Sequence, residues 1–196
     1  MSGIPVGEME TDALLRRSLG AFESLRCEMM LSHSSPPGME EWLRVKAAEL
    51  IGKKSFWILS SGASTMWSMH EADGFALLPA ETAECPKGTG VTVWFRQPVP
   101  WSRRALFQGS DDPAFTRIVT PVRKKGADLA IRPVGSLGGL AALARGEGHL
   151  AACHLLDGKT GRYNDAFIEE FANGEPWVRV LLYYREQGFL VAKGNP

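Results

Sequence analysis

The sequence predicts an α+β region followed by an α/β region: a small β-barrel-like domain with an N-terminal helix, then a lobe built on a parallel sheet. Residues 40–97 hold short segments rich in aromatic and β-branched residues, separated by Gly, Pro and Ser, which is typical of antiparallel strands. Residues 104–184 instead alternate apolar strand patterns with helical patterns, which indicates βαβ units. A proline-rich stretch, QPVPW at residues 97–101, separates the two regions.

The first region begins with an amphipathic helix expected over residues 10–24, where apolar residues follow the possible cap Thr11 at helical spacing: Leu14, Leu15, Leu19 and Phe22. Its strand candidates are EEWLRVKAAEL, KKSFWILS, GFALLPA and TGVTVWFRQ. These short, punctuated segments predict a small antiparallel sheet or barrel. We expect this domain to span residues 1–98.

The second region contains four apolar strand candidates, RALFQG, DLAIRPVG, HLAACHLL and WVRVLLYY. Helical patterns around residues 112–125, 137–146 and 164–173 separate them. Such alternation predicts a parallel sheet with helices on its faces, over residues 103–196. The last segment, REQGFLVAKGNP, is expected to return as a hairpin through Gln187 and Gly188.

Composition excludes several classes of function. The chain has 196 residues, 44% of them hydrophobic, and its 22 basic and 22 acidic residues cancel. A neutral chain offers no long-range field for nucleic acid or an anionic membrane, so we expect neither partner. No apolar run approaches the roughly 20 residues that span a bilayer, and MSGIPVGEMETD lacks the features of a signal peptide. A cytoplasmic location is therefore expected.

The three cysteines, Cys27, Cys85 and Cys153, are odd in number and far apart in the sequence. They form no Cys-x-x-Cys spacing and have no nearby His pair, so the sequence does not predict a zinc site or any other protein-ligated metal cation. We expect reduced thiols that serve as packing residues.

Two strand candidates end in Gly-Ser just before a helical pattern, at Gly109-Ser110 and Gly135-Ser136. Ligands of open α/β sheets bind at the carboxyl ends of strands, where helix N-termini present unpaired N–H groups. Two such ends side by side predict a cup for a small oxyanion, with donors from both serine hydroxyls and from the backbone N–H groups of Asp111 and Leu137. His154, at the end of the third strand candidate, is a further possible donor.

A plainer interpretation stays open for each of these residues. Ser is among the best N-cap residues, so a Gly-Ser pair before a helix is expected wherever a strand turns tightly into one. Asp111 and Asp112 would repel an anion and are expected to point to solvent. A histidine at a strand end is equally often a hydrogen-bonded structural residue. No catalytic residues are predicted.

The second region also resembles a known family. GSDDPAF, VGSLGGLAALARGEGHLAACHLLDGKTGRYN and YYREQGFLVAKGNP are similar to the periplasmic-binding-protein-like domain of cytoplasmic proteins of molybdenum metabolism. The resemblance covers about residues 103–196 and implies a three-layer α/β lobe whose ligand would be molybdate or tungstate. Because such proteins hold the ligand between two lobes, it also implies that a second lobe is needed.

The first region resembles the C-terminal part of the MoeA/gephyrin family of molybdopterin molybdenumtransferases. The resemblance rests on GIPVG, GMEEWLRVKA and STMWSMHEADGFALLPAETAECPKGTGVTVWF, in which Ala72, Asp73, Gly74 and Pro79 match a turn into a strand of the family's barrel. The catalytic domain of that family would precede Gly3, and residues 1–100 hold no carboxylate pair or Gly-rich loop to replace it. We therefore expect no transferase activity from this chain alone, and a longer parent chain to supply that domain.

Four functions compete. The leading one is recognition of a small oxyanion such as molybdate or tungstate in molybdenum-cofactor biosynthesis. The alternative is a ligand-free interaction or dimerisation module, because MoeA-type proteins are dimers and the first region is rich in aromatic residues: Trp42, Phe56, Trp57, Trp67, Trp94, Phe95 and Trp101. Those rings would otherwise fill a small barrel core. The transferase itself and the sensor half of a transcription regulator rank below, the latter because no helix-turn-helix or basic face is present.

Overall fold

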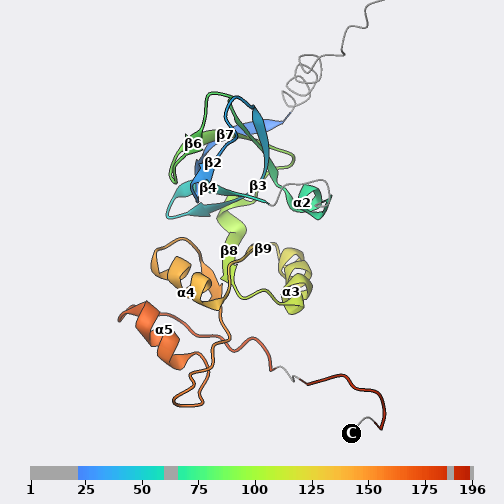
Figure 1. Ribbon diagram of the computed structural model, residues 1–196, viewed down its shortest axis with the longest axis vertical. Helices are drawn as coiled ribbons and strands as arrows, with labels where there is room; N and C mark the ends of the chain where they lie inside the picture. The colour runs from blue at the N-terminus through green and yellow to red at the C-terminus, as the bar shows by residue number, and fades with distance from the viewer. Residues whose placement is uncertain (1–21, 60–65, 185–187, 195–196) are drawn as a thin grey trace, which may run out of the picture.

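The computed structural model describes residues 22–59, 66–184 and 188–194. Within these ranges the chain forms a closed β-barrel and then a lobe in which helices flank a three-stranded parallel sheet. Figure 1 shows the barrel and the lobe one after the other along the long axis of the molecule. The fold class expected from the sequence, a barrel-like β domain followed by a three-layer α/β lobe, is confirmed.

Five strands close the barrel in the order β1-β4-β3-β5-β7. Their bounds are β1 Glu23–Met29, β3 Glu41–Leu50, β4 Lys53–Ile58, β5 Gly74–Leu78 and β7 Gly90–Phe95. Every neighbouring pair is antiparallel except β1 with β4. Closure leaves none of these strands with a free edge, which protects the barrel from edge-to-edge association. The described part of this domain also contains a short ribbon of β2 (His33–Ser34) with β6 (Glu84–Cys85), and helix α2 (Met66–Glu71).

The barrel interior follows from the alternation of apolar residues along its strands. In β5 and β7 every second residue is buried, as a strand with one face on a core requires. The buried core comprises Cys27, Met29, Leu43, Val45, Ala47, Phe56, Ala76, Leu78, Cys85, Val91, Val93, Phe95 and Val99. Phe56 and Phe95 therefore belong to the core, as the packing interpretation of the aromatic residues expected.

The lobe is a parallel sheet in the order β10-β8-β9. Its elements are β8 Arg104–Gly109, α3 Pro113–Lys124, β9 Asp128–Pro133, α4 Ser136–Ala144, β10 Leu150–Ala152 and α5 Asp165–Ala172. Helices α3 and α4 lie on opposite sides of the sheet (Figure 1). Right-handed crossovers require this, because the chain moves one way from β8 to β9 and then back past β8 to β10. One sheet face packs on α3 through Phe107, Leu129 and Phe115.

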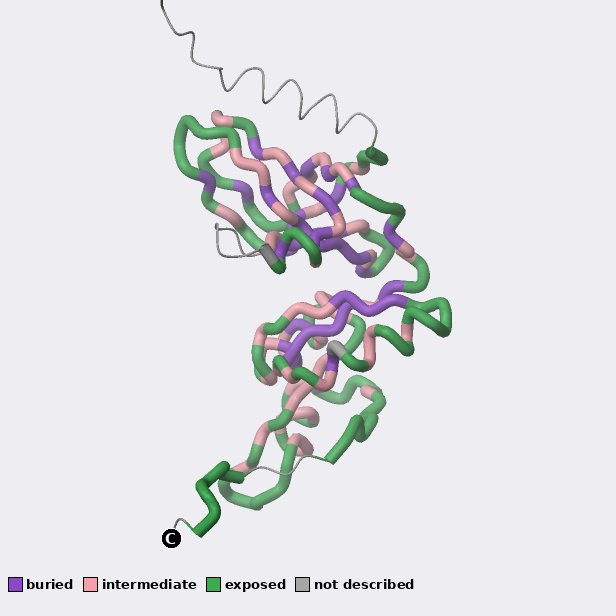
Figure 2. The backbone as a smooth tube through the Cα atoms, turned by 90° about the vertical axis from the view of Figure 1, so that its right-hand side faces the viewer, coloured by how far each residue is buried: buried purple, intermediate pink, exposed green. Residues whose placement is uncertain are grey.

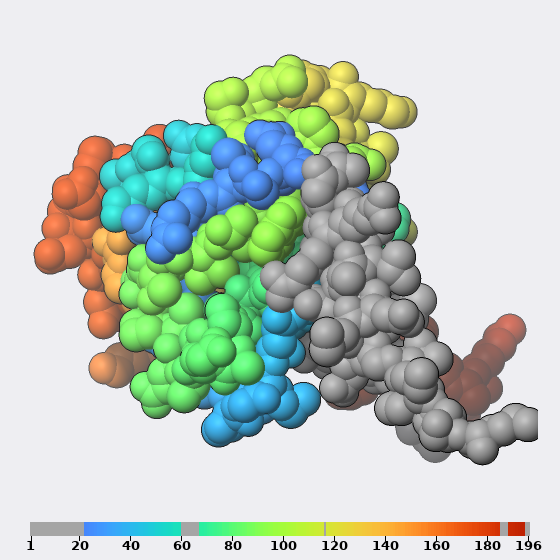
Figure 3. All heavy atoms as spheres, turned by 90° about the horizontal axis from the view of Figure 1, so that it is seen from above, coloured from blue at the N-terminus to red at the C-terminus, as the bar shows by residue number. Residues whose placement is uncertain are grey.

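The barrel and the lobe share a second hydrophobic core, so they pack directly against each other. Residues 97–100 lead from β7 to the single 3₁₀ turn η1 (Trp101–Arg103), and β8 starts at once. Leu106 and Ala130 of the lobe sheet then pack with barrel residues Ala48, Leu50 and Trp57. Viewed from above (Figure 3), the blue to green barrel lies over the lobe, whose yellow and orange parts emerge at its margins.

Two expected elements need correction. The helix expected over residues 10–24 lies mostly outside the described residues, but Glu23 and Ser24 at its end belong to strand β1. The fourth strand candidate, WVRVLLYY at residues 177–184, pairs with no strand among the described residues and is irregular. A strand exists only through hydrogen bonds to a neighbour, so apolar alternation alone does not make one. Figure 2 shows this C-terminal segment as exposed, in contrast to the buried run through β8.

Candidate functional site

The three parallel strands end together at one edge of the sheet. Gly109 O at the end of β8 accepts hydrogen bonds from Val134 N (3.0 Å) and Gly135 N (2.9 Å), which follow β9. On the other side, Ser110 N donates to Ala152 O of β10 at 3.1 Å. These bonds tie both Gly-Ser turns to the same strand ends, which we call the carboxyl edge.

Gly109 is required at this edge by both conformation and space. Its φ of +142° lies in a region that side chains rarely adopt, and a Cβ there would lie 2.3 Å from Ala152 O. Helix α4 approaches equally closely, since a Cβ on Gly139 would lie 2.6 Å from the Cα of Gly109. Gly109 therefore lets β8, β10 and helix α4 approach one another closely.

Ser136 and His154 meet across the carboxyl edge. The Ser136 hydroxyl oxygen accepts a hydrogen bond from His154 N at 3.1 Å. A hydroxyl that accepts one bond still has a proton to donate. The His154 ring lies 4.7 Å from the Tyr163 ring, between centroids, at a tilt of 35°. Thus Ser110, Ser136 and His154 all connect to the segment that runs from Ala152 to residue 154.

The two helix N-termini at this edge differ. Helix α4 starts after Gly135, which has no side chain to cap the helix, so its first N–H groups have no side-chain acceptor from the cap residue. Helix α3 starts after Asp112, whose Oδ1 accepts from Ala114 N at 2.8 Å. Ser136 begins α4, but α3 begins after Asp112 rather than at Ser110, so the expectation that Asp112 points to solvent is wrong. The Asp112 carboxylate caps the α3 terminus, where the helix dipole favours a negative charge.

Of the remaining predicted site residues, Asp111 and Leu137 are exposed, Leu137 by 50%. The structure brings Ser110, Ser136 and His154 to one edge and leaves these two side chains at the surface beside it. Asp112 is the residue whose role the sequence analysis missed, although an Asp just before a Pro-initiated helix is a recognisable N-cap signal.

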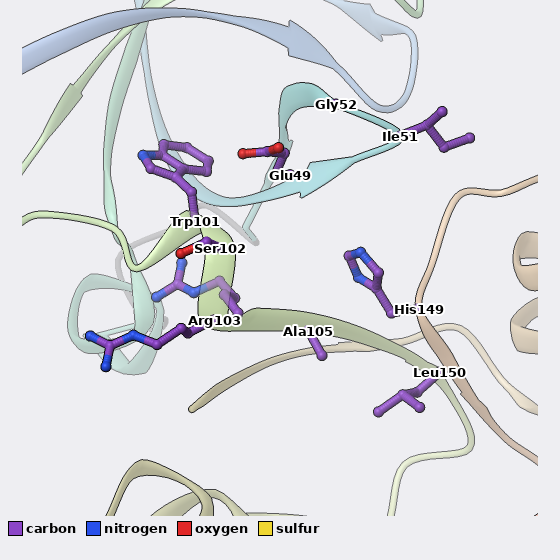
Figure 4. Close-up of a pocket in the computed structure, with 10 residues that line it drawn as sticks. Glu49, Ile51, Gly52, Trp101, Ser102, Arg103, Ala105, His149 and Leu150 are labelled. Atoms are coloured by element: carbon purple, nitrogen blue, oxygen red, sulfur yellow. The ribbon is translucent and has the colours of Figure 1, made fainter. Parts of the chain in front are cut away.

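A cleft of about 460 Å³ lies elsewhere, between the barrel and the lobe. Figure 4 shows Glu49 and Trp101 on one side of it and His149 and Leu150 on the other. His149 Nδ1 accepts from Leu106 N at 2.9 Å, which leaves the proton of the neutral ring on Nε2.

Arg104 joins the barrel to the lobe at the back of this cleft. It is 8% exposed, and its Nε donates to Asp128 Oδ2 at 2.6 Å, while its Nη1 donates to Asp73 Oδ2 at 2.5 Å and to Ala47 O at 2.9 Å. Burial lowers the pKa of Arg104, but the charges and hydrogen bonds of Asp73 and Asp128 raise it by more than burial lowers it. The pKa of Arg104 therefore lies above its ordinary value. The Ala72-Asp73-Gly74 turn, interpreted from sequence as turn chemistry, therefore also supplies the barrel carboxylate of this junction.

Asp128 receives a second cation from α3. Arg123 Nε donates to its Oδ1 at 2.8 Å. Burial raises the pKa of Asp128, but the hydrogen bonds and charges of Arg123 and Arg104 outweigh burial and hold that pKa below its ordinary value. The carboxylate is thus ionised and shared between strand and helix.

The cysteines give a prediction about reactivity. Cys27 and Cys85 are buried and Cys153 is half-buried, and all three are free thiols. Burial raises the pKa of Cys27 to about 11, against a smaller lowering by Lys54. Since the thiolate is the reactive form, a thiol reagent at pH 8 should label Cys153 first and reach Cys27 and Cys85 only on unfolding. Mass spectrometry of partly labelled native protein checks this order, and early labelling of Cys27 would contradict it.

The architecture defines a class of protein: a closed β-barrel followed by an α/β lobe with a parallel sheet. Residues 27–95 match the MoeA C-terminal region (domain IV), and residues 120–196 match the PBP superfamily domain. These two matches confirm the resemblance drawn from the sequence, to a MoeA C-terminal region followed by a periplasmic-binding-protein-like domain.

Among solved structures, the chain is similar to the molybdopterin biosynthesis MoeA protein from Pyrococcus horikosii, with 22% sequence identity. The match covers 45% of this chain and 22% of that chain, with a TM-score of 0.33, which is too low to support an argument about fold. No curated protein matches the chain. Among the described residues, no helix is long and apolar enough to cross a membrane, and no three His, Cys, Asp or Glu side chains are grouped to hold a metal ion.

Proposed function

We propose that the lobe binds a small oxyanion, such as molybdate or tungstate, at the carboxyl edge, as part of molybdenum-cofactor metabolism. The observation that carries this proposal is the N-terminus of α4, which has no side-chain cap and begins at Ser136. The first N–H groups of a helix and the positive end of its dipole attract an anion. The Ser136 hydroxyl, held by His154 N, would add a donor.

The hydrogen-bond donors at the carboxyl edge lie on one side of the expected ligand position. Because the Asp112 carboxylate already caps α3, we expect the ligand to bind against α4 rather than between two helix ends. The assigned donors are the hydroxyls of Ser110 and Ser136 and the N–H groups of Leu137 and Gly138, with His154 at the rim. A ligand held on one side makes few contacts, and these offset little of the entropy lost when the ligand is immobilised. Binding by this lobe alone should therefore be weak.

The C-terminal segment supports a second lobe as partner. Between residues 178 and 191 many apolar side chains are at least half exposed: Val178, Val180, Leu181, Leu182, Tyr184, Phe189, Leu190 and Val191. Exposed apolar side chains in this number call for a covering surface. We propose that a second lobe, or the catalytic domain of a longer parent chain, covers them, and that a second lobe would also close over the ligand.

Calorimetry with molybdate, tungstate and sulfate tests the site. Ser136→Ala should weaken millimolar molybdate binding about fivefold or more, since a hydrogen bond to a charged ligand is lost. Ser136→Thr keeps the hydroxyl and should retain binding, and Ser102→Ala removes an exposed hydroxyl outside the edge and should change nothing. The absence of heat at millimolar oxyanion, or equal binding by Ser136→Ala, would contradict the proposal. Anomalous scattering from tungstate-soaked crystals locates the ion directly.

Dimerisation is the second candidate function. Trp67, 69% exposed, and Met69, 40% exposed, lie on α2 and give the barrel an apolar surface. Aromatic side chains and Met are enriched at interfaces. A homodimer through α2 would raise the mass measured by light scattering, and Trp67→Ser should return it to that of one chain.

A further inference from the structure

Arg132 lies half-buried on β9, on the sheet face opposite α3, with a fixed position. Its Nη1 donates to Gln108 Oε1 at 2.7 Å, and Gln108 itself is only 1% exposed. The Gln108 amide nitrogen donates in turn to Glu147 O at 2.5 Å. A fully buried amide that is held at both ends fixes the guanidinium in one place.

The charge of Arg132 is not matched by a carboxylate. In the part of the chain that the structure describes, its hydrogen-bond partner is the neutral amide of Gln108, and no Asp or Glu forms an ion pair with it. Burial lowers the pKa of Arg132, and the nearby charge of Glu147 only partly opposes this. A desolvated cation with an amide as its partner is costly unless an anion compensates it.

Glu147, the nearest negative charge, is already engaged twice. Lys87, from the turn after β6 of the barrel, forms an ion pair with its Oε1, and Arg145 Nη2 donates to its Oε2 at 2.7 Å. The side chains of Lys87 and Arg145 remain 55% and 59% exposed. Two cations thus contact the Glu147 carboxylate, and Arg132 is linked through Gln108 to the Glu147 backbone oxygen. Together the three cations and the one carboxylate carry two positive charges in excess.

We propose that Arg132, Lys87 and Arg145 form a binding site for a phosphate-type dianion at the junction of barrel and lobe. Arg132 uses one of its five N–H donors on Gln108, so the others can face the anion in the fork geometry that phosphate oxygens accept. Glu147 keeps Lys87 and Arg145 beside it. Inorganic phosphate and the phosphate group of an ester share this chemistry.

This site is distinct from the carboxyl edge in its donors and in its partner domains. The carboxyl edge offers backbone N–H groups and hydroxyls of the lobe, whereas this site combines side-chain cations of the lobe with Lys87 of the barrel. An anion held by both domains would bind only when they keep their present arrangement. Binding is therefore linked to the stability of the junction.

Titration with inorganic phosphate at pH 7.5 tests the proposal, by calorimetry and by the unfolding midpoint, against chloride at equal ionic strength. Arg132→Gln should weaken phosphate binding at least about tenfold, because a charge-assisted hydrogen bond is lost. Lys87→Gln, an exposed change in the barrel, should weaken it several-fold. Arg103→Gln removes an exposed cation outside the site and should leave binding unchanged, which also controls for general salt effects of phosphate.

The result has two readings. Selective loss in Arg132→Gln and Lys87→Gln, with Ser136→Ala unaffected, supports a junction site that is separate from the carboxyl edge. Equal phosphate affinity in wild type, Arg132→Gln and Lys87→Gln, or no phosphate binding beyond the chloride control, overturns it. Circular dichroism of each variant confirms that the fold is retained.

Discussion

Replacing Arg104 by Met should lower the free energy of unfolding by about 3–5 kcal/mol, the cost of removing one partner from a buried ion pair. The change leaves Asp73 and Asp128 near each other without their shared cation, and their side chains are 12% and 8% exposed. It also removes the donor to Ala47 O, which ties the barrel to the lobe. Urea unfolding followed by tryptophan fluorescence measures the loss.

Arg103→Met is the matched control, because Arg103 is the preceding residue and is exposed. An exposed change of this kind should alter stability by less than about 0.5 kcal/mol. If Arg104→Met and Arg103→Met had equal effects, the junction would not depend on the buried ion pairs. If Arg104→Met unfolded in two steps, with one step at a lower urea concentration, the cooperative unfolding of barrel and lobe would depend on Arg104.

The pH dependence of unfolding stability is an independent test of the Arg104→Met prediction. The folded-state pKa of Asp128 is depressed, so this group contributes stability that is present above its unfolded pKa, about 3.9, and is lost as pH falls through the folded pKa. In Arg104→Met that depression is smaller. The difference in stability between wild type and Arg104→Met should therefore be constant near neutral pH and shrink below about pH 4.

Replacing Gly109 by Ala should destabilise the lobe by about 3 kcal/mol or more, since backbone strain and steric overlap act together. The added Cβ would lie 2.3 Å from Ala152 O at a φ of +142°, so β8 and β10 could not keep their present spacing. The carboxyl edge would open. Oxyanion binding, where it is measurable in wild type, should be lost with it.

Gly126→Ala separates the two causes. Gly126 also has a positive φ, +82°, but the nearest atom to an added Cβ is the end of the exposed Arg103 side chain at 3.5 Å. Only backbone strain remains, which should cost about 1–2 kcal/mol. Thermal unfolding of both variants compares them directly, and equal losses would mean that close approach at Gly109 does not matter.

Much of the fold follows from local patterns. The alternation of GFALL and GVTVWF produced strands β5 and β7, and the two Gly-Ser turns fell at neighbouring strand ends, as a βαβ order demands. The helical patterns around residues 112–125 and 137–146 correspond to α3 and α4. Period and turn chemistry act within a few residues, so the sequence displays them directly.

The predictions that failed concern segments whose conformation depends on contacts with residues distant in the sequence. The segment at residues 177–184 has the apolar alternation of a strand, but no described strand pairs with it. At α3, Ser110 and Asp112 are both good cap residues, but the bond from Ser110 N to Ala152 O holds Ser110 at the sheet edge, and the helix begins only after Asp112. Local sequence offers both choices, and only the position of β10 separates them.

The sequence by itself determined the order of a β region and an α/β region, the family resemblance of each, and the residues available at the carboxyl edge. Only the tertiary structure decided how the two regions join, through Arg104 with Asp73, 31 residues away. It also decided that Arg132 bonds to a buried amide and, among the described residues, to no carboxylate. The reason is physical: a charge is compensated by whatever lies within a few ångströms in space, and sequence separation says nothing about that distance.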